Sequence, residues 1–350
     1  MARIRCAGRD PGLILPAPRP GSFAAHKHSV SRGALRLLMN SPPFHSGFVC
    51  VAGRPNVGKS TLVNRLVGRD ISITSPKPQT TRTRILGVLR APGWQAVLVD
   101  TPGIHDARDP LNQRLVRYAL GALSDADVVL VLVEPLGFRR DGSAGGDPVN
   151  TALRDADLQV LEHVRSVKAP VFLVVNKVDG ASEAAVLETL KRYGDLARFA
   201  EIVPVSALTG RNVPRLASLI GARLPEGPPY FEDSQVTDQP LPQVLGELVR
   251  QEVFRRLEEE LPYSTAVTVE HMEAKGKLTV VHARIVVERD SQKGIVIGKG
   301  GRMLKTIGQG ARRRMEGVLG TRVYLELTVA VLADWSRNPR HLAALGYPEE

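Results

Sequence analysis

Cysteine and long apolar runs are both scarce in this sequence, and each absence restricts the class of protein. Cys6 and Cys50 are the only two cysteines among 350 residues, which argues against a disulfide framework or a cysteine-rich metal site. Cys50 lies in a predicted core strand, where a thiol packs as a small apolar side chain. No apolar run approaches the roughly 18 residues that span a bilayer. We therefore expect a globular protein of a reducing compartment, the cytoplasm.

Acidic residues are nearly absent from the first 46 residues, where Asp10 is the single acid against seven arginines and lysines. The segment is rich in Pro, Gly, Ala and Ser and has no apolar period, so residues 1–45 are predicted to be a disordered basic extension. Two interpretations are open: a transit peptide, or a tail or overextended start with Met39 as the true initiator. We favour the second and exclude the segment from the fold.

Positive charge is in excess over the whole chain, with a formal net charge of +11 at pH 7. Such an excess favours a polyanionic partner, which is RNA, DNA or an anionic membrane surface. The charge alone does not choose among these. The length of the chain permits two domains, each with its own core.

The most specific pattern is a G-x-x-x-x-G-K-S phosphate-binding loop between an apolar strand at residues 48–52 and a helix at residues 61–67. Its glycines let backbone N–H groups surround the β-phosphate at a helix N-terminus, which already favours an anion. The loop lysine then reaches the β- and γ-phosphates, and the serine hydroxyl takes a magnesium position. A nucleoside triphosphate is therefore expected to bind Gly53, Arg54, Pro55, Asn56, Val57, Gly58, Lys59 and Ser60.

Two later segments supply candidates for the magnesium ion and the γ-phosphate. Residues 71–84 are polar and broken by proline, which is typical of a switch segment, and either Thr80 or Thr81 is the candidate switch threonine. The strand at residues 94–99 ends in Asp100, where a second magnesium-linked carboxylate belongs. The backbone N–H of Gly103 can approach the γ-phosphate. This second motif consists of Asp100, Thr101, Pro102, Gly103 and Ile104.

Guanine selectivity is predicted by an N-K-x-D motif after the buried strand at residues 170–175. Asp179 can accept hydrogen bonds from N1–H and the 2-amino group of guanine, a donor pair that adenine lacks, and an unpaired carboxylate would cost at least ~1–3 kcal/mol. Asn176 is expected to tie the base loop to the phosphate loop, and the stem of Lys177 to lie along the purine face. A following S-A-L motif completes the base pocket through a backbone N–H to the guanine oxygen. The nucleotide-binding candidates here are Asn176, Lys177, Val178, Asp179, Ser206, Ala207 and Leu208.

The order of these motifs, each at the end of a strand in a β/α alternation, predicts a GTPase with a doubly wound, mainly parallel sheet over residues 46–226. Ile104 stands where Ras-type proteins place a water-orienting glutamine. GTPases with Asn56 in the loop and an apolar residue after the D-T-P-G glycine resemble a class that uses potassium as an added positive charge. The catalytic candidates are Asn56, Lys59, Thr81, Asp100 and Gly103, and the candidate magnesium ligands are Ser60, Thr81 and Asp100.

A second, smaller α+β domain is predicted at residues 241–347, after a proline-rich linker at residues 227–240. A helix at 241–261 and strands at 266–270, 278–288 and 322–331 surround a G-x-x-G loop that precedes a basic helix at 302–318. Such a loop is the clamp by which KH domains hold single-stranded nucleic acid. The expected RNA-binding residues are Ile295, Val296, Ile297, Gly298, Lys299, Gly300, Gly301, Arg302 and Lys305.

Taken together, the chain resembles the Era family of bacterial ribosome-assembly GTPases from about residue 46 to residue 347. Besides the motifs above, the resemblance rests on residues 45–49, 78–82, 305–308 and 342–347. It implies a type-II KH domain that binds 16S ribosomal RNA near its 3′ end, a role in maturation of the small (30S) subunit, and stronger RNA binding with GTP than with GDP. It also implies a monomer with peripheral association at the inner membrane face.

Two functional hypotheses from different classes remain open at this stage. The first is an RNA-regulated GTPase whose hydrolysis times release from a pre-ribosome. The second is an assembly factor in which nucleotide only locks the domain orientation, and Ile104 in place of glutamine keeps it open. A third, an Era-like GTPase that serves tRNA modification, is disfavoured by the G-x-x-G clamp.

Overall fold

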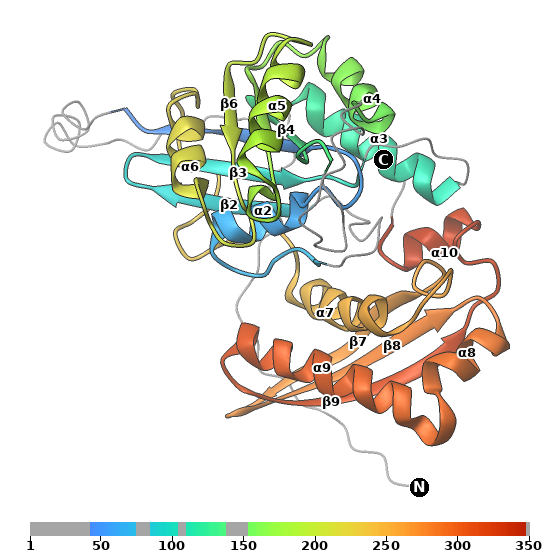
Figure 1. The fold of residues 1–350 in the computed structure, drawn as a ribbon. Coiled ribbons are helices and arrows are strands. Elements are labelled where there is room, and N and C mark those ends of the chain that lie inside the picture. Colours follow the sequence, from blue (N-terminus) through green and yellow to red (C-terminus); the bar gives the residue numbers. More distant parts are fainter. Residues whose placement is uncertain (1–42, 75–84, 104–109, 138–152, 348–350) are drawn as a thin grey trace, which may run out of the picture. The chain divides into compact units, whose positions relative to one another are not determined.

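The computed structural model describes residues 43–74, 85–103, 110–137 and 153–347. Three residues singled out above, Thr80, Thr81 and Ile104, lie outside the described residues, as does the basic extension up to residue 42. The two predicted domains are each described separately below (Figure 1). Within the described part of the chain, no helix is long and apolar enough to cross a membrane.

The first domain is built on a six-stranded sheet in the order β2-β3-β1-β4-β5-β6. Four of its five strand pairs are parallel, and only β2 pairs antiparallel, with β3. These pairings confirm the predicted mainly parallel sheet, whose inner strands are apolar on both faces because helices cover both. The strands are β1 (His45–Ala52), β2 (Ile85–Ala91), β3 (Trp94–Asp100), β4 (Val128–Val133), β5 (Val171–Val175) and β6 (Glu201–Pro204).

Helices lie on both faces of this sheet and divide the apolar core into two layers (Figure 1). One layer packs α2 (Lys59–Val67) and α6 (Val213–Gly221) against the sheet. The other holds α3 (Pro110–Ser124), α4 (Asp155–Val164) and α5 (Glu183–Gly194). Cys50 is a free, fully buried cysteine in the second layer, which confirms its predicted structural role. The fold is therefore the predicted doubly wound one.

The proline-rich linker follows the first domain closely. The Gln95 side chain of β3 accepts from the backbone N–H groups of Tyr230 and Phe231 at 2.8 and 3.0 Å. On β2, the Val88 amide donates to the carbonyl of Val236 at 3.0 Å. The Leu86 amide donates to the Asp238 carboxylate at 3.2 Å. The linker thus supplies hydrogen-bond partners to the exposed edge of β2, which would otherwise be left unpaired.

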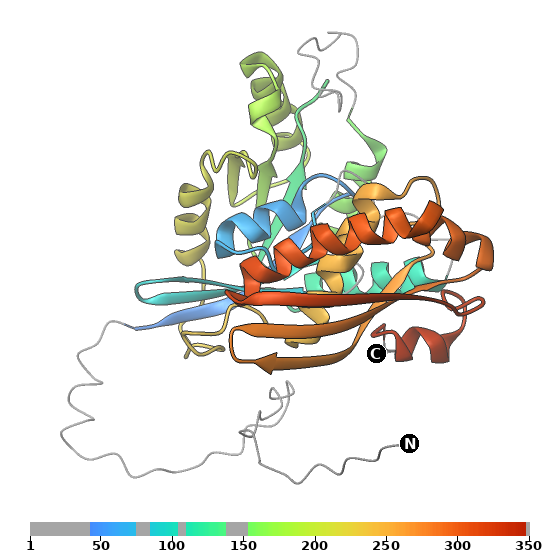
Figure 2. The same ribbon diagram turned by 90° about the horizontal axis from the view of Figure 1, so that it is seen from below.

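The second domain has a three-stranded sheet in the order β7-β8-β9, antiparallel between the first pair and parallel between the second. Side chains of α7, α8 and α9 share one core with it, so the helices cover one face of the sheet (Figure 2). This arrangement is the predicted type-II KH fold. Its elements are α7 (Leu241–Arg256), β7 (Ala266–Lys275), β8 (Leu278–Val287), α8 (Asp290–Ile297), α9 (Arg302–Leu319), β9 (Arg322–Val331) and α10 (Pro339–Ala344).

Two elements of this domain differ from their predicted lengths. The helix predicted over residues 241–261 ends at Arg256, because three glutamates at 258–260 oppose the helix dipole at a C-terminus and Pro262 follows. Strand β7 continues to Lys275 instead of ending at residue 270. An irregular register between Val269 and His271 interrupts the apolar alternation on which the shorter prediction rested.

Candidate functional site

The phosphate-binding loop joins β1 to α2, and its backbone has the conformation that its glycines predict. Gly58 has a φ of 100°, and a Cβ placed there would lie 2.3 Å from the Asn176 side-chain nitrogen. Only glycine fits this position without moving the N-K-x-D segment at residues 176–179, which we call the guanine loop. The loop N–H groups therefore sit at the start of α2, as the sequence predicts for a phosphate cradle.

The ammonium of Lys59 is buried inside this loop. It donates to the carbonyls of Gly53 and Arg54, each at 3.0 Å. Burial lowers the pKa of Lys59 to about 8, although Asp100 partly opposes the shift. At pH 7 the group is therefore still cationic, and a buried cation of this kind fits a phosphate ligand.

The second motif meets the loop from the neighbouring strand. Asp100, at the end of β3, pairs in register with Val51 of β1 and is fully buried. Thr101 donates its hydroxyl to the Val51 carbonyl at 2.8 Å. A Cβ on Gly103 would lie 2.7 Å from Pro55, so this glycine lets the two loops touch. The Asp100 carboxylate at the end of β3 and the Ser60 hydroxyl in the first turn of α2 are oxygen donors of the kind that Mg²⁺ prefers, and the site fits that ion.

The guanine loop is tied to the phosphate loop by Asn176, as the sequence predicts. Its amide nitrogen donates to the Val57 carbonyl at 2.9 Å, and its oxygen accepts from the Ala207 amide at 2.9 Å. The Ser206 amide donates to the Arg211 carbonyl. Within the described residues, two of the three S-A-L amides are thus engaged, and the Leu208 amide is the remaining candidate donor to guanine. Asp179 is exposed, ready to meet a base.

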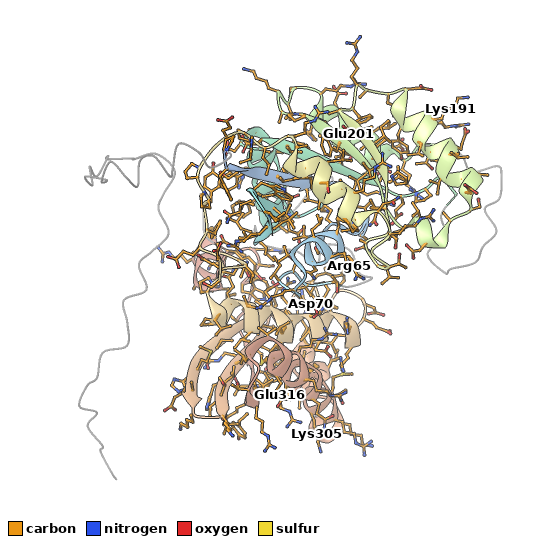
Figure 3. The ribbon with its side chains drawn as sticks, turned by 90° about the vertical axis from the view of Figure 1, so that its left-hand side faces the viewer. Arg65, Asp70, Lys191, Glu201, Lys305 and Glu316 are labelled. Carbon is orange, nitrogen blue, oxygen red and sulfur yellow. The ribbon has the colours of Figure 1, made fainter. Side chains whose placement is uncertain are left out.

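Arg65 on α2 supports the S-A-L loop at residues 206–208, and no motif in the sequence identifies this residue (Figure 3). Its Nε donates to the Ala207 carbonyl at 3.1 Å, and its Nη2 donates to the Leu208 carbonyl. The residue lies five residues after Ser60 on α2, a spacing that no standard motif marks. It holds the loop by its backbone and so acts on the base indirectly.

Replacing Arg65 by alanine is expected to weaken GDP and GTP binding equally, by roughly 5- to 30-fold, because two hydrogen bonds from a cation contribute about 1–2 kcal/mol at a partly exposed site. Fluorescence titration with labelled nucleotides measures both affinities. Arg69→Ala, four residues further on, is the matched control and should leave both unchanged. A selective loss of GTP binding alone would contradict this role.

The G-x-x-G loop of the KH domain links α8 to α9 and exposes its basic residues. Gly298, Gly300 and Gly301 all have positive φ values, of 71°, 60° and 76°. Lys299 is exposed in the loop, and Lys305 is exposed on α9 (Figure 3). Glycines in these conformations allow close approach of a sugar–phosphate backbone, with cations beside it.

One of the predicted RNA-binding residues is not available for that role. Val296 is fully buried in the core of the KH domain, whereas its neighbour Ile295 is 57% exposed. The prediction that all three apolar residues of this run line the groove is therefore wrong for Val296. Successive residues of a helix point about 100° apart, so three in a row cannot face one groove.

The strand predicted at residues 322–331 is β9, and it forms the other wall of the groove, a role that the sequence did not indicate. A groove of about 490 Å³ lies between α9 and β9. Its aromatic residue, Tyr324, is 55% exposed and offers a face on which a base can stack. In the sequence, a tyrosine at a predicted exposed position of an alternating strand is the feature that could have indicated a base-stacking site here. The groove is lined by Gly301, Leu304, Lys305, Gly308, Gln309, Arg312, Val323, Tyr324, Leu325 and Leu327.

This fold and these loops define a P-loop GTPase joined to a KH domain. Residues 48–177 match the family model described as a 50S ribosome-binding GTPase, and residues 260–336 match a KH domain. Both matched ranges lie inside the predicted domains.

Comparison with curated proteins is more specific. The chain is 48% identical over 311 residues to GTPase Era of Geobacter metallireducens, covering 88% of this chain and 100% of that protein. It is 44% identical to GTPase Era of Heliobacterium modesticaldum over 87% of this chain and 98% of that protein. The chain belongs to the Era family of GTPases.

Solved structures agree with this assignment. A crystal structure of Era in complex with MgGDPNP and nucleotides 1506–1542 of 16S ribosomal RNA is similar, with a TM-score of 0.79 and 36% identity over 87% of this chain and 100% of that one. An Era variant from Aquifex aeolicus bound to GDP·AlF4⁻ matches with the same TM-score, identity and coverage.

Proposed function

We propose that this GTPase binds 16S ribosomal RNA near its 3′ end through the KH domain and assists assembly of the small ribosomal subunit, with GTP favouring the RNA-bound state. The observation that carries the proposal is the exposed G-x-x-G loop beside a groove with a stacking tyrosine. A similar protein holds a GTP analogue and this RNA at once. Hydrolysis would then time release of the protein from its RNA.

Nucleotide recognition follows from the loop contacts. Asp179 accepts from the guanine N1–H and 2-amino groups, and the side-chain stem of Lys177 lies along the purine face. The Leu208 amide donates to the guanine oxygen, since the amides of Ser206 and Ala207 are engaged. Lys59 and the loop amides bind the phosphates. Ser60 and Asp100, together with Thr80 or Thr81, hold Mg²⁺. The ion neutralises charge that develops on the phosphates.

RNA recognition uses the KH surface. The G-x-x-G loop at residues 298–301 lies against the sugar–phosphate backbone, while Arg302 and Lys305 supply cations. Ile295 and Ile297 contact unstacked bases from the side of α8, and Tyr324 stacks on one from β9. We further propose that the protein acts as a monomer in the cytoplasm, with peripheral contact to the anionic inner membrane face, and that residues 46–226, 227–240 and 241–347 are the GTPase domain, linker and KH domain.

The test is binding of a labelled oligonucleotide that matches the 3′ end of the source organism's 16S RNA. It is measured with GDPNP and then with GDP, against a scrambled oligonucleotide and over a salt series. Sequence-selective binding that strengthens with GDPNP supports the proposal. Equal binding to both oligonucleotides with a steep salt dependence would mean that charge gives only non-specific affinity, and the ribosomal role would fall.

Potassium is proposed as the added positive charge at the phosphates, near Asn56. This residue adopts a left-handed conformation in the loop, with a φ of 63°. Since one electrostatic donor at a developing charge contributes about 10²–10³ in rate, GTP turnover should be about tenfold or more faster in potassium than in sodium buffer at equal ionic strength. A phosphate-release assay measures this. Equal rates in the two salts would remove potassium from the mechanism.

A further inference from the structure

A buried carboxylate stands between the two nucleotide-binding loops. Glu134 is the first residue after β4 and is 2% exposed. Strand β4 pairs with β1 on one side and with β5 on the other. Because the carboxyl ends of parallel strands share one edge of the sheet, Glu134 lies between the phosphate loop after β1 and the guanine loop after β5.

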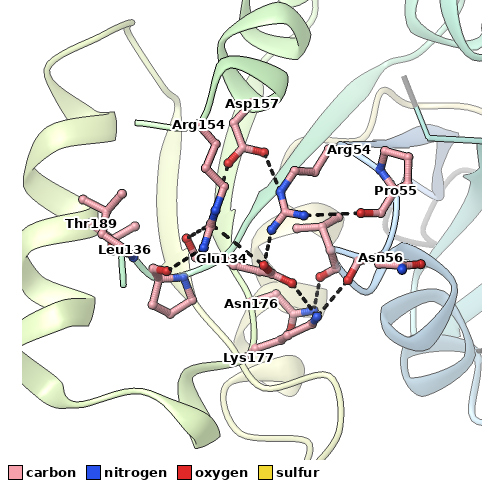
Figure 4. Close-up of polar contacts among 12 residues, drawn as sticks. Arg54, Pro55, Asn56, Glu134, Leu136, Arg154, Asp157, Asn176, Lys177 and Thr189 are labelled. Carbon is pink, nitrogen blue, oxygen red and sulfur yellow. Dashed lines mark hydrogen bonds and ion pairs between the residues drawn. The ribbon is translucent and has the colours of Figure 1, made fainter. Parts of the chain in front are cut away.

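The two oxygens of this carboxylate contact one cation from each loop (Figure 4). Oε1 pairs with the Lys177 ammonium of the guanine loop, and Oε2 pairs with the Arg54 guanidinium of the phosphate loop. The Lys177 ammonium also donates to the Asn56 carbonyl at 2.7 Å. Lys177, Glu134 and Arg54 therefore form a continuous ionic link between the loops, in addition to the amide link through Asn176.

The remaining partners hold Arg54 and the carboxylate in place. Asp157 of α4 lies 3.2 Å from the Arg54 Nε, and Tyr193 of α5 donates to Asp157 at 2.8 Å. Arg154 lies 3.8 Å from Glu134 Oε2 and 4.0 Å from Asp157 Oδ2. Burial alone would raise the pKa of Glu134, but Arg54 and Lys177 outweigh it and hold the pKa below its ordinary value. Glu134 is thus an anion at neutral pH.

We propose that Glu134 is a positioning residue for nucleotide binding: its carboxylate fixes the Lys177 ammonium, and with it the side-chain stem against which the purine lies, relative to the phosphate loop. The proposal rests on the proposed role of Lys177 at the base. Without the carboxylate, Arg54 and Lys177 would face each other as like charges beside the loop, and the lysine would move away from the base. Because GDP and GTP share the base and the β-phosphate, the effect is the same for both.

A purely structural ion pair is the competing explanation, and its consequence is different. It would lower the stability of the folded protein while leaving the affinity for nucleotide unchanged. Glu252 offers a matched control, because it is a buried carboxylate whose ion pairs within the described residues are with arginines of the KH domain, namely Arg255, Arg256 and Arg314. Glu252→Gln should therefore lower the melting temperature without nucleotide and change the dissociation constant for GDP less than threefold.

The experiment compares dissociation constants for labelled GDP and GDPNP in the full chain. Glu134→Gln should raise the dissociation constants for GDP and GDPNP at least tenfold and by the same factor. Lys177→Met keeps the apolar stem and removes the ammonium, so it should cause a similar loss. If Glu134 acts through that ammonium, the dissociation constant of the double variant is at most three times that of the single variant with the lower affinity.

The outcomes separate this proposal from the roles on which it rests. Losses that multiply in the double variant, or a Glu134→Gln affinity within twofold of the unsubstituted chain, would overturn it. Failure of the unsubstituted chain to bind guanine nucleotide would instead overturn the proposed nucleotide site. Melting temperatures without nucleotide show whether each variant folds. If Glu134→Gln does not, Glu134→Asp keeps the charge but is one methylene too short to hold both cations, and its affinity for both nucleotides should fall with the fold intact.

Discussion

Replacing Asp179 by asparagine should exchange guanine for xanthine as the preferred base. The carboxylate accepts two donors of guanine, and each hydrogen bond to a charged group contributes about 1.5–3 kcal/mol, so GTP affinity should fall roughly 10²- to 10⁴-fold. Xanthine carries a carbonyl in place of the 2-amino group, and the asparagine amide can donate to it. Competition of GTP, XTP and ATP against labelled nucleotide measures the exchange.

Asp179 is exposed, and within the described part of the chain its side chain makes no ion pair that the substitution would remove, so the test reports on the base. Asp195→Asn, at the end of α5, is a matched control on another exposed aspartate and should leave all three affinities unchanged. If the Asp179 variant lost GTP without gaining XTP, the residue would contribute to the loop and not to base recognition.

The second large effect is expected in the G-x-x-G loop, for a double substitution of Lys299 and Gly300 by aspartate. Gly300 has a φ of 60°, a Cβ added there would meet open space, and aspartate tolerates this conformation. The loop then carries two anions in place of one cation, against the RNA phosphates. We expect RNA affinity to fall roughly a hundredfold or more at low salt, measured by fluorescence anisotropy with the 16S oligonucleotide.

The choice of positions matters for interpreting that result. Gly298→Asp would be a poorer test, since a Cβ there would lie 2.8 Å from the Met303 Cβ and misfolding would look like lost RNA contact. Gly276 and Lys277 in the β7–β8 hairpin give the matched control, with a φ of 61° and open space at the glycine. If aspartates at this control pair reduced RNA binding as much, the loop would hold no special contact with RNA.

Most of the nucleotide site was predictable because its motifs are local. Each motif follows a strand of the sheet, and the parallel topology brings the strand ends to one edge, so Lys59, Asp100 and Asn176 fall where the order of motifs places them. Glu134 and Arg65 were not predictable in this way. Glu134 contacts Arg54 and Lys177, and Arg65 contacts Ala207 and Leu208, across 43 to 143 residues of the chain, and no spacing in the sequence records such contacts.

The KH groove was predicted only in part, for a physical reason. The glycines and cations of its loop are contiguous, and the structure exposes Lys299 and Lys305 as expected. Whether a given side chain on α8 or β9 points into the core or toward solvent depends on how these elements pack. That packing buries Val296 and exposes Tyr324, and an apolar run of three residues does not show which of them faces inward.

The hydrogen-bonded linker changes where the GTPase domain ends as an independently expressed fragment. A fragment cut at residue 226 would lose the partners of the Leu86 and Val88 amides and of the Gln95 side chain. It would present β2 as a bare edge strand, which is a template for aggregation. A protease should likewise spare residues 230–238 in the folded chain. The practical boundary of a GTPase fragment therefore lies after Asp238, two residues before the start of α7 at Leu241.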